Sequence, residues 1–321
     1  MVRRLLPLLL GAGLLACAPV QQAGPVGPLP AVQSSAEAAR DLGPHRAGTE
    51  WWYVSSSLPD AGLALHWALF KVELLGRTLY VSHTAITDLK TGQVQFVETS
   101  QQAGASAGGV PLVVTQDGTT LRQTADGFTL QGPQFQLNLS PQGPFIRHPD
   151  SGLPQFGVLA YQSLPNLALS GTVRGQPVQG QAWLDHQWGG QQPGQGVYWD
   201  WMGLHTSDGG SLMLYRLRDA AGQVQQLYGT RVRPNGQPQA LSGLEMTPGR
   251  VWTSGTGRTY TLGWQLRAEG LDLTVDAPHD AQELQSRTTR VNYWEGPVQG
   301  SGTLDGTAVT VNGMGEFLSS R

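Results

Sequence analysis

Four side chains in the middle of the chain combine a carboxyl group, an imidazole and two aromatic rings. His186 and Trp188 lie two residues apart, and so do Tyr198 and Asp200. In an apolar pocket desolvation keeps a carboxylic acid neutral, so Asp200 can act as a proton donor. The rings of Trp188 and Tyr198 can stabilise a cation through their faces, and His186 can accept a proton. The alternative is structural: Asp200 caps a turn and the rings pack a β-barrel.

The residues next to these four are expected on the opposite faces of their strands. Side chains alternate along a β-strand, so Asp185 points away from His186, and Trp199 and Trp201 point away from Asp200. If both faces of these strands meet a pocket, Asp185, Trp199 and Trp201 contribute to its wall. We therefore include these three as candidate substrate-pocket residues.

Other site chemistries have less support. The seven histidines show no His-x-x-x-His or paired Cys/His spacing, so no metal site is predicted. Strands can bring His66 and His83 together, but a hydrogen-bonded structural histidine is the expected role of each. Glu50 and Glu295, each beside a tryptophan, are expected to hydrogen-bond exposed backbone groups at barrel mouths. No glycine-rich phosphate cradle or dinucleotide fingerprint follows an apolar run, so no cofactor is predicted.

The composition fits many short strands and turns. The 321 residues include 43 glycines and 21 prolines, and only 13% are charged, against about 25% in an average domain. This length allows two domains of ordinary size or one large β-rich domain. The formal net charge of -3 provides no positive field for a phosphate backbone, so nucleic acid is not an expected partner.

The first 17 residues are typical of a bacterial lipoprotein signal. Arg3 and Arg4 precede a short apolar run and the segment Leu14-Leu15-Ala16-Cys17, which resembles a lipobox. We predict a signal peptide over residues 1–17, lipidation of Cys17, and an extracytoplasmic protein held at the membrane by this anchor. The alternative is an ordinary secretory signal. Cys17 is the only cysteine, so no intramolecular disulfide can form.

Behind the signal the chain divides into a tether and a β-rich body. Residues 18–44 are rich in Pro, Gly, Gln and Ala, which predicts a disordered tether before a fold that begins near His45. Segments such as Gln134–Leu139 and Gly270–Val275 then alternate apolar and polar residues. No segment shows a sustained apolar stripe of helical period. The pattern therefore predicts an all-β protein.

Two internal similarities suggest that the body is built twice. Trp51-Trp52-Tyr53 is followed 148 positions later by Trp199-Asp200-Trp201, and Gly171–Val178 is followed 131 positions later by the similar Gly302–Val309. Each unit thus opens with an aromatic cluster and closes with a hairpin. The boundary falls in the Gly-, Gln- and Pro-rich stretch 189–196, which gives domains over residues 45–192 and 193–321.

Four ordered motifs resemble one known family, the carotenoid 1,2-hydratase and AttH-like family, often labelled predicted secreted hydrolases. They are Thr49–Tyr53, Ala182–Trp188, the run Trp199–Asp219 and Tyr293–Gly296. The resemblance implies two lipocalin-like antiparallel β-barrels in tandem. It also implies addition of water to the terminal double bond of an acyclic carotenoid. The functional positions of that family, a His-x-Trp pair and a Tyr-x-Asp pair, match His186, Trp188, Tyr198 and Asp200.

These observations lead to one functional hypothesis and two alternatives. We expect a hydratase-like lyase that adds water to a double bond of a hydrophobic, isoprenoid or carotenoid-like molecule in an apolar pocket, with Asp200 as the acid and His186 as the base. The first alternative is a non-catalytic carrier of hydrophobic ligands at the cell envelope, as single lipocalin barrels often are. The second is a pocket that folds a polyene for cyclisation.

Overall fold

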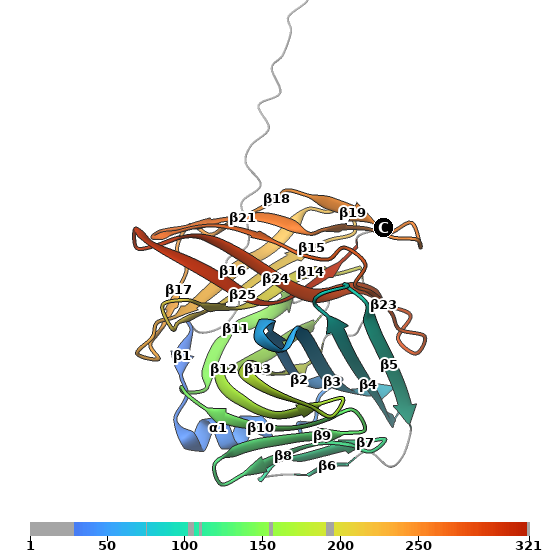
Figure 1. The fold of residues 1–321 in the computed structure, drawn as a ribbon. Helices are drawn as coiled ribbons and strands as arrows, with labels where there is room; N and C mark the ends of the chain where they lie inside the picture. The colour runs from blue at the N-terminus through green and yellow to red at the C-terminus, as the bar shows by residue number, and fades with distance from the viewer. Residues whose placement is uncertain are drawn as a thin grey trace, which may run out of the picture.

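The computed structural model describes residues 29–74, 76–101, 106–108, 111–153, 157–190 and 196–319 (Figure 1). The predicted signal peptide, Cys17 and the first part of the predicted tether lie outside these residues. Among the described residues, no helix has both the length and the apolar character needed to cross a membrane.

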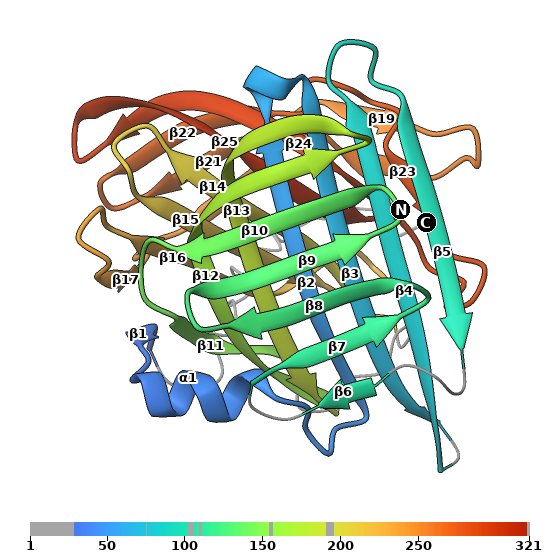
Figure 2. The same cartoon turned by 60° about the horizontal axis from the view of Figure 1, so that its bottom comes forward.

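The first sheet is antiparallel and has 13 strands in the order β5-β4-β3-β2-β13-β12-β10-β9-β8-β7-β6, with β1 and β11 attached beside β12. Its strands are β1 (Ala31–Val32), β2 (Thr49–Leu58), β3 (Leu63–Leu74), β4 (Arg77–Asp88), β5 (Val94–Gln101), β6 (Ser106–Gly108), β7 (Val113–Gln116), β8 (Thr119–Thr124), β9 (Gly127–Gly132), β10 (Phe135–Pro141), β11 (Ile146–Leu153), β12 (Gly157–Val173) and β13 (Gln176–Gly189). A 3-10 turn, Pro59–Ala61, joins β2 to β3. The sheet curls into a nearly closed barrel (Figure 2).

The second sheet has 10 strands in the order β17-β16-β15-β14-β25-β24-β22-β21-β18, with β23 paired to β24, and forms a half-barrel. Its strands are β14 (Tyr198–Thr206), β15 (Ser211–Arg218), β16 (Val224–Val232), β17 (Pro238–Ala240), β18 (Glu245–Pro248), β21 (Gly263–Ala268), β22 (Leu271–Asp276), β23 (Glu283–Gln285), β24 (Asn292–Leu304) and β25 (Thr307–Leu318). A small separate ladder pairs β19 (Val251–Thr253) with β20 (Thr259–Thr261). The prediction of an all-β protein with two tandem barrel domains is confirmed.

The two sheets repeat one plan. In each, the first long strand lies between the second strand and the last one: β2 pairs with β3 and β13, and β14 pairs with β15 and β25. In chain order, the last two long strands of each sheet form a hairpin, β12 with β13 and β24 with β25. Both hairpin turns have two residues of positive φ, Arg174-Gly175 and Asp305-Gly306. Such two-residue turns match the twist of the paired strands.

Alternation of side chains builds a separate core in each domain. On β10, Phe135, Leu137 and Leu139 are buried and the residues between them are exposed, as predicted. The first core centres on Trp52 and Trp67 inside the barrel. The core of the second domain contains Trp264, Trp294 and Phe317. A third buried cluster, which includes Tyr53, Trp183, Trp201 and Tyr215, lies between the two sheets.

The N-terminal segment belongs to the folded body. Strand β1 pairs with β11, and helix α1 (Ser35–Leu42) follows it (Figure 2). Ser34 caps the helix: its side chain accepts a hydrogen bond from the backbone N–H of Glu37, and the Glu37 carboxylate accepts one from the N–H of Ser34. At the other end Leu42 is fully buried in the first core.

The prediction of a disordered tether over residues 18–44 is therefore wrong for residues 29–44, and the fold begins well before His45. The sequence of this segment contains two local signals of a helix, which its Pro-, Gly-, Gln- and Ala-rich composition obscures. One is the capping box Ser-x-x-Glu, which satisfies free backbone donors at the start of a helix. The other is the spacing of Ala38 and Leu42, which places both on one face of α1, where both are buried.

Candidate functional site between the two domains

A cavity of about 110 Å³ lies between the outer face of the first sheet and the second domain. We call it the interdomain cavity. Its wall includes three carboxylic acids, Asp185, Glu295 and Glu316, and one histidine, His83. The other conspicuous wall residues are aromatic: Trp51, Tyr53, Phe70, Trp199, Trp201, Tyr215 and Tyr293. The cavity thus joins acidic groups to an extensive surface of aromatic rings.

Equivalent strands of the two domains supply both sides of the wall. On β2, Trp51 and Tyr53 face the cavity, whereas Trp52 between them is buried inside the barrel. On β14, Trp199 and Trp201 stand at the equivalent positions, 148 residues later, and also face the cavity. The sequence duplication is therefore visible as two aromatic pairs on opposing walls.

The carboxyl groups follow the same duplication. Asp185 on β13 lies directly opposite Tyr53 on β2, and Glu316 on β25 lies directly opposite Trp201 on β14. Asp185 and Glu316 are separated by 131 positions, the spacing that also relates the two closing hairpins. The third carboxyl group, Glu295, lies opposite Glu316 on β24.

Asp185 is buried and hydrogen-bonded to a tryptophan. The indole N–H of Trp183 donates to Oδ1 of Asp185 at 2.6 Å. Burial raises the pKa of Asp185 to about 8, although hydrogen bonds from Trp183 and Tyr161 oppose the rise. At neutral pH this group is therefore mainly a neutral carboxylic acid.

Glu295 and Glu316 influence each other. The hydroxyl of Tyr53 donates to Oε1 of Glu295 at 2.6 Å, and the indole N–H of Trp199 donates to Oε1 of Glu316 at 2.8 Å. Burial raises the pKa of Glu316 to about 7. Burial and the neighbouring charge of Glu316 raise the pKa of Glu295 well above its ordinary value, against the hydrogen bond from Tyr53. At least one of the two carboxyl groups therefore keeps its proton at neutral pH.

His66 lies behind Glu295 and remains uncharged. Its Nε2 is 3.2 Å from Oε2 of Glu295, but the two atoms are not aligned for a hydrogen bond. Burial, with the nearby His83, lowers the pKa of His66 to about 3. No charged imidazole therefore stabilises the ionised form of Glu295 from this side.

Of the residues predicted from sequence, Asp185, Trp199 and Trp201 lie on the cavity wall, and His186 and Trp188 do not. His186 points to the opposite face of β13, where its Nε2 lies 3.0 Å from Oε1 of Glu50. Trp188 stacks on the ring of His45 with centroids 4.1 Å apart. Both belong to the barrel end near α1.

Asp200 and Tyr198 are also not among the residues that line the cavity. The carboxylate of Asp200 is buried and accepts hydrogen bonds from Nε of Arg216 at 2.8 Å and Nε of Arg218 at 2.9 Å. The guanidinium of Arg216 stacks over Trp264 in the core of the second domain, 4.5 Å from the ring centroid. Tyr198 packs against a small cluster that contains Leu284.

These positions correct the expectation that both faces of the two strands open into one pocket. The alternation along β13 and β14 is as predicted. The cavity meets only the face of β13 that carries Asp185 and the face of β14 that carries Trp199 and Trp201. The other faces are enclosed, one inside the barrel and one inside the second domain, so His186 and Asp200 lie apart.

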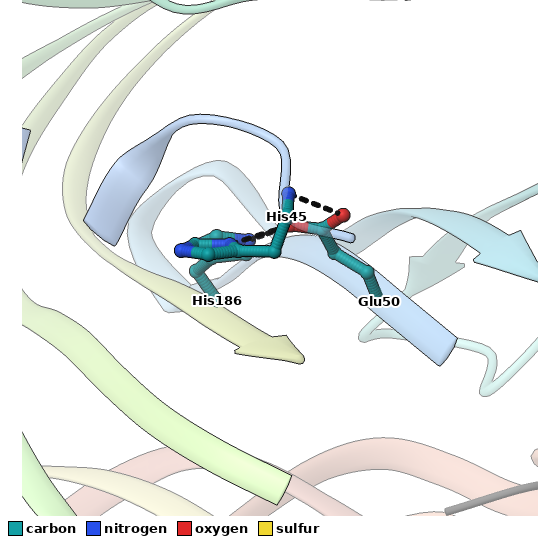
Figure 3. A group of neighbouring side chains, drawn as sticks. All are labelled: His45, Glu50 and His186. Atoms are coloured by element: carbon teal, nitrogen blue, oxygen red, sulfur yellow. Dashed lines mark hydrogen bonds and ion pairs between the residues drawn. The ribbon is translucent and has the colours of Figure 1, made fainter. Parts of the chain in front are cut away.

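A second group of side chains attaches α1 to the barrel, and His45, Glu50 and His186 lie at its centre (Figure 3). Glu50 accepts hydrogen bonds from the backbone N–H of His45 at 2.9 Å and from the ammonium of Lys71 at 3.2 Å. Nδ1 of His186 lies 2.7 Å from the carbonyl oxygen of Asp41. Burial opposes ionisation of Glu50, but hydrogen bonds from His186 and His45 hold its pKa at about 2. Glu50 thus has the structural role predicted for it.

The same group contains the ligand types of a metal site. Atoms of His45, Glu50 and His186 lie within 4.8 Å of one another, an arrangement that the spacing along the chain did not reveal. Lys71, however, already supplies a positive charge to the Glu50 carboxylate. The hydrogen bonds of this group have a structural explanation, which is the attachment of the N-terminal segment to the barrel.

Two carboxyl groups of the cavity, Glu295 and Glu316, are not predicted there from the sequence. Glu295 was expected to bond backbone groups at a barrel mouth, and this prediction is wrong, because its side chain faces the cavity and bonds Tyr53. Glu316 lies in none of the four motifs that indicate the family. The duplication contained a signal for it, since the 131-residue spacing of the hairpins relates Glu316 to Asp185.

Comparison with known proteins agrees with the fold. Residues 30–317 match the AttH-like family. The crystal structure of a protein assigned as AttH from Nitrosomonas europaea superposes with a TM-score of 0.76 at 24% identity, covering 92% of this chain and 99% of that one. Kievitone hydratase from Nectria haematococca gives a TM-score of 0.60 at 18% identity, covering 93% and 96%.

The structure of CghA with Sch210972 gives a TM-score of 0.53 at 14% identity, covering 86% of this chain and 89% of that one. At these identities the likenesses establish a common fold. No curated protein matches the chain. Because the family match extends over nearly the whole described body, the chain belongs to the AttH-like family.

Proposed function

We propose that this protein is a hydratase-like lyase that adds water to a double bond of a hydrophobic, isoprenoid or carotenoid-like substrate. The observation that carries the proposal is the presence of three carboxyl groups, the buried Asp185 and Glu295 and the half-buried Glu316, on a wall of aromatic rings. An isolated alkene is a weak base, so its hydration needs an acid that keeps its proton at neutral pH. Burial and the proximity of like charges create such an acid.

We assign the acid to Glu295 in place of Asp200. Glu295 lies on the cavity wall and its pKa is raised well above the ordinary value by burial and by Glu316. In the reaction the O–H bond of its carboxyl group breaks, a C–H bond forms on one alkene carbon, and the other carbon becomes a carbocation. Ring faces of the wall stabilise this cation, worth roughly 0.5–2 kcal/mol per ring.

The size of the cavity and one structural neighbour bear on the substrate and the reaction. At about 110 Å³ the cavity is smaller than the ~300–1,000 Å³ of most small-molecule sites, so we propose that it receives the reacting end of a longer molecule. Kievitone hydratase, which shares the fold, is by its name a hydratase. This supports the class of reaction proposed here.

The test is turnover of the purified protein with lycopene, squalene and geraniol, followed by mass spectrometry of the hydrated product. Glu295→Gln keeps the shape of the side chain but removes the acidic proton, so we expect turnover to fall by at least ~10²-fold. Glu245→Gln, the same change at an exposed position on β18, is the matched control and should leave turnover unchanged.

A carrier would behave differently in the same experiment. It would quench tryptophan fluorescence on binding these molecules, form no product, and bind equally well after Glu295→Gln, because apolar burial dominates the affinity. Binding without product in the wild-type protein, or full turnover in Glu295→Gln, would contradict the proposal.

We also propose that a lipid on Cys17 anchors the protein outside the cytoplasm. The lipobox-like segment that ends at Cys17 supports this proposal.

A further inference from the structure

A chain of three polar side chains leads from the edge of the first sheet into the interdomain cavity. Nδ1 of His83 on β4 lies 2.6 Å from the hydroxyl of Tyr293 on β24, across the domain boundary. Nε2 of the same ring lies 3.0 Å from Oε2 of Glu98 on β5. His83 and Tyr293 are buried and both line the cavity, whereas the side chain of Glu98 is 13% exposed.

The partners of Glu98 determine where the protons of His83 lie. Its other oxygen, Oε1, accepts hydrogen bonds from the backbone N–H and the hydroxyl of Thr288 at 3.0 and 2.9 Å. Burial opposes ionisation, but hydrogen bonds from His83 and Thr288 hold the pKa of Glu98 at about 2. An ionised carboxylate only accepts hydrogen bonds, so Nε2 of His83 carries a hydrogen and donates it.

In a neutral imidazole the other nitrogen is then an acceptor. Burial, with the nearby acids Glu295, Glu316 and Glu98, raises the pKa of Tyr293 well above its ordinary value, so the phenol keeps its proton. The Tyr293 hydroxyl therefore donates to Nδ1 of His83. The order of donors is Tyr293 to His83 to Glu98, in which a third group fixes the tautomer of a potential base.

We infer that Tyr293, His83 and Glu98 form a proton relay that takes the proton released by the water added to the substrate. The inference rests on the proposed function and supplies the base that acid catalysis by Glu295 requires. The attacking water forms a C–O bond with the carbocation and loses a proton to the oxygen of Tyr293. The phenolic proton moves at the same time to Nδ1 of His83, and the imidazolium is stabilised by the Glu98 carboxylate.

The three residues have different roles in this relay. Tyr293 touches the water and is a catalytic residue. His83 holds the proton, and Glu98 is a positioning residue that acts through His83. The position fits an acid and a base that act on neighbouring carbons of one double bond, because Tyr293 and Glu295 lie two residues apart on β24 and both face the cavity.

The competing explanation is a structural tie between the domains. A hydrogen bond of this structural kind starts from β4, the strand of His83. There the hydroxyl of Thr87 donates to the side-chain oxygen of Gln282 at 2.7 Å, also across the domain boundary. Thr87→Val removes that tie and leaves the relay intact, so it controls for loosening of the interface.

The first measurement needs no substrate. Nitrogen NMR of the full chain labelled on its histidines reports the tautomer of His83, assigned by the loss of its signals in His83→Gln. We expect a neutral ring with hydrogen on Nε2 in the wild type. A ring with hydrogen on Nδ1 would overturn the relay, whatever the enzyme does.

The second measurement is turnover of lycopene, squalene and geraniol. We expect Tyr293→Phe and Glu98→Gln to lower kcat by ~10²-fold or more with little change in KM, and Thr87→Val to leave kcat unchanged. Unchanged kcat in Tyr293→Phe or Glu98→Gln, or an equal loss in Thr87→Val, overturns the relay while hydration itself stands. A wild-type protein without turnover contradicts the proposed function and, with it, the relay.

Discussion

Glu295 and Glu316 lie opposite each other on neighbouring strands β24 and β25, and both side chains face the interdomain cavity. Two carboxyl groups placed side by side in a buried site cannot both ionise easily. Asp185 lies on the wall of the same cavity and also has a raised pKa. The cavity therefore contains carboxyl groups that keep protons at neutral pH among aromatic rings. This property can be tested by measuring the free energy of unfolding as a function of pH, as well as by measuring turnover.

The stability of the protein should depend on the protons held by Glu316. Its pKa is about 7 in the folded chain, against ~4.3 for an unfolded chain, so the folded state binds more protons between these values. The resulting stabilisation is complete below about pH 4 and is lost as the pH rises through 7. We expect the free energy of unfolding of the wild type, relative to that of Glu316→Gln, to fall between pH 5 and pH 8 by on the order of 3 kcal/mol.

Urea unfolding at a series of pH values measures this difference. Asp60→Asn, which changes an exposed carboxyl group, is the control and should follow the wild type. A difference between wild type and Glu316→Gln that is independent of pH would show that Glu316 does not hold a proton in the folded state.

Asp200 should act on stability and not on chemistry. Its carboxylate compensates two buried guanidinium groups, those of Arg216 and Arg218, so Asp200→Asn leaves them short of one negative charge. Removal of one partner of a buried ion pair costs up to about 3–5 kcal/mol. We expect a lower midpoint of urea unfolding, with kcat per folded molecule unchanged at low temperature. Loss of kcat without loss of stability would return the acid role to Asp200.

The N-terminal segment should contribute to the stability of the barrel. Leu42 is fully buried in the first core, so Leu42→Ala should lower the free energy of unfolding by roughly 2–5 kcal/mol. Leu29→Ala is the matched control, because Leu29 is 71% exposed. Limited proteolysis should then cut residues 29–44 faster in Leu42→Ala than in Leu29→Ala. Equal stability of the two variants would mean that the segment is not part of the cooperative fold.

The anchor can be tested by changing one sulfur atom to oxygen. Cys17→Ser removes the thiol that would carry the lipid, so we expect the protein to move from the membrane fraction to the aqueous fraction of detergent-free extracts. Mass spectrometry of the wild type should find an acylated Cys17 at the mature N-terminus. A membrane-bound Cys17→Ser protein together with an unmodified wild type would contradict lipidation.

Local patterns in the sequence determined the fold class and its duplication. Alternation of apolar residues in segments such as Gln134–Leu139 specifies a strand with one buried face, and β10 forms there. Hairpin turns are also local, because a glycine after Arg174 or Asp305 accepts the positive φ that the turn needs. Motifs spread along the chain were sufficient to indicate the family.

Only the tertiary structure decided which face of each strand meets the cavity. Every residue of β15 is buried, and so is every residue of β14 after Trp199. A strand buried on both faces carries no contrast between a polar and an apolar side, so its sequence cannot distinguish a barrel interior from a domain interface. Asp185 and His186 are adjacent in the chain and equally hidden from solvent. The docking of the second domain against the outside of the first barrel places Asp185 beside the cavity and leaves His186 inside.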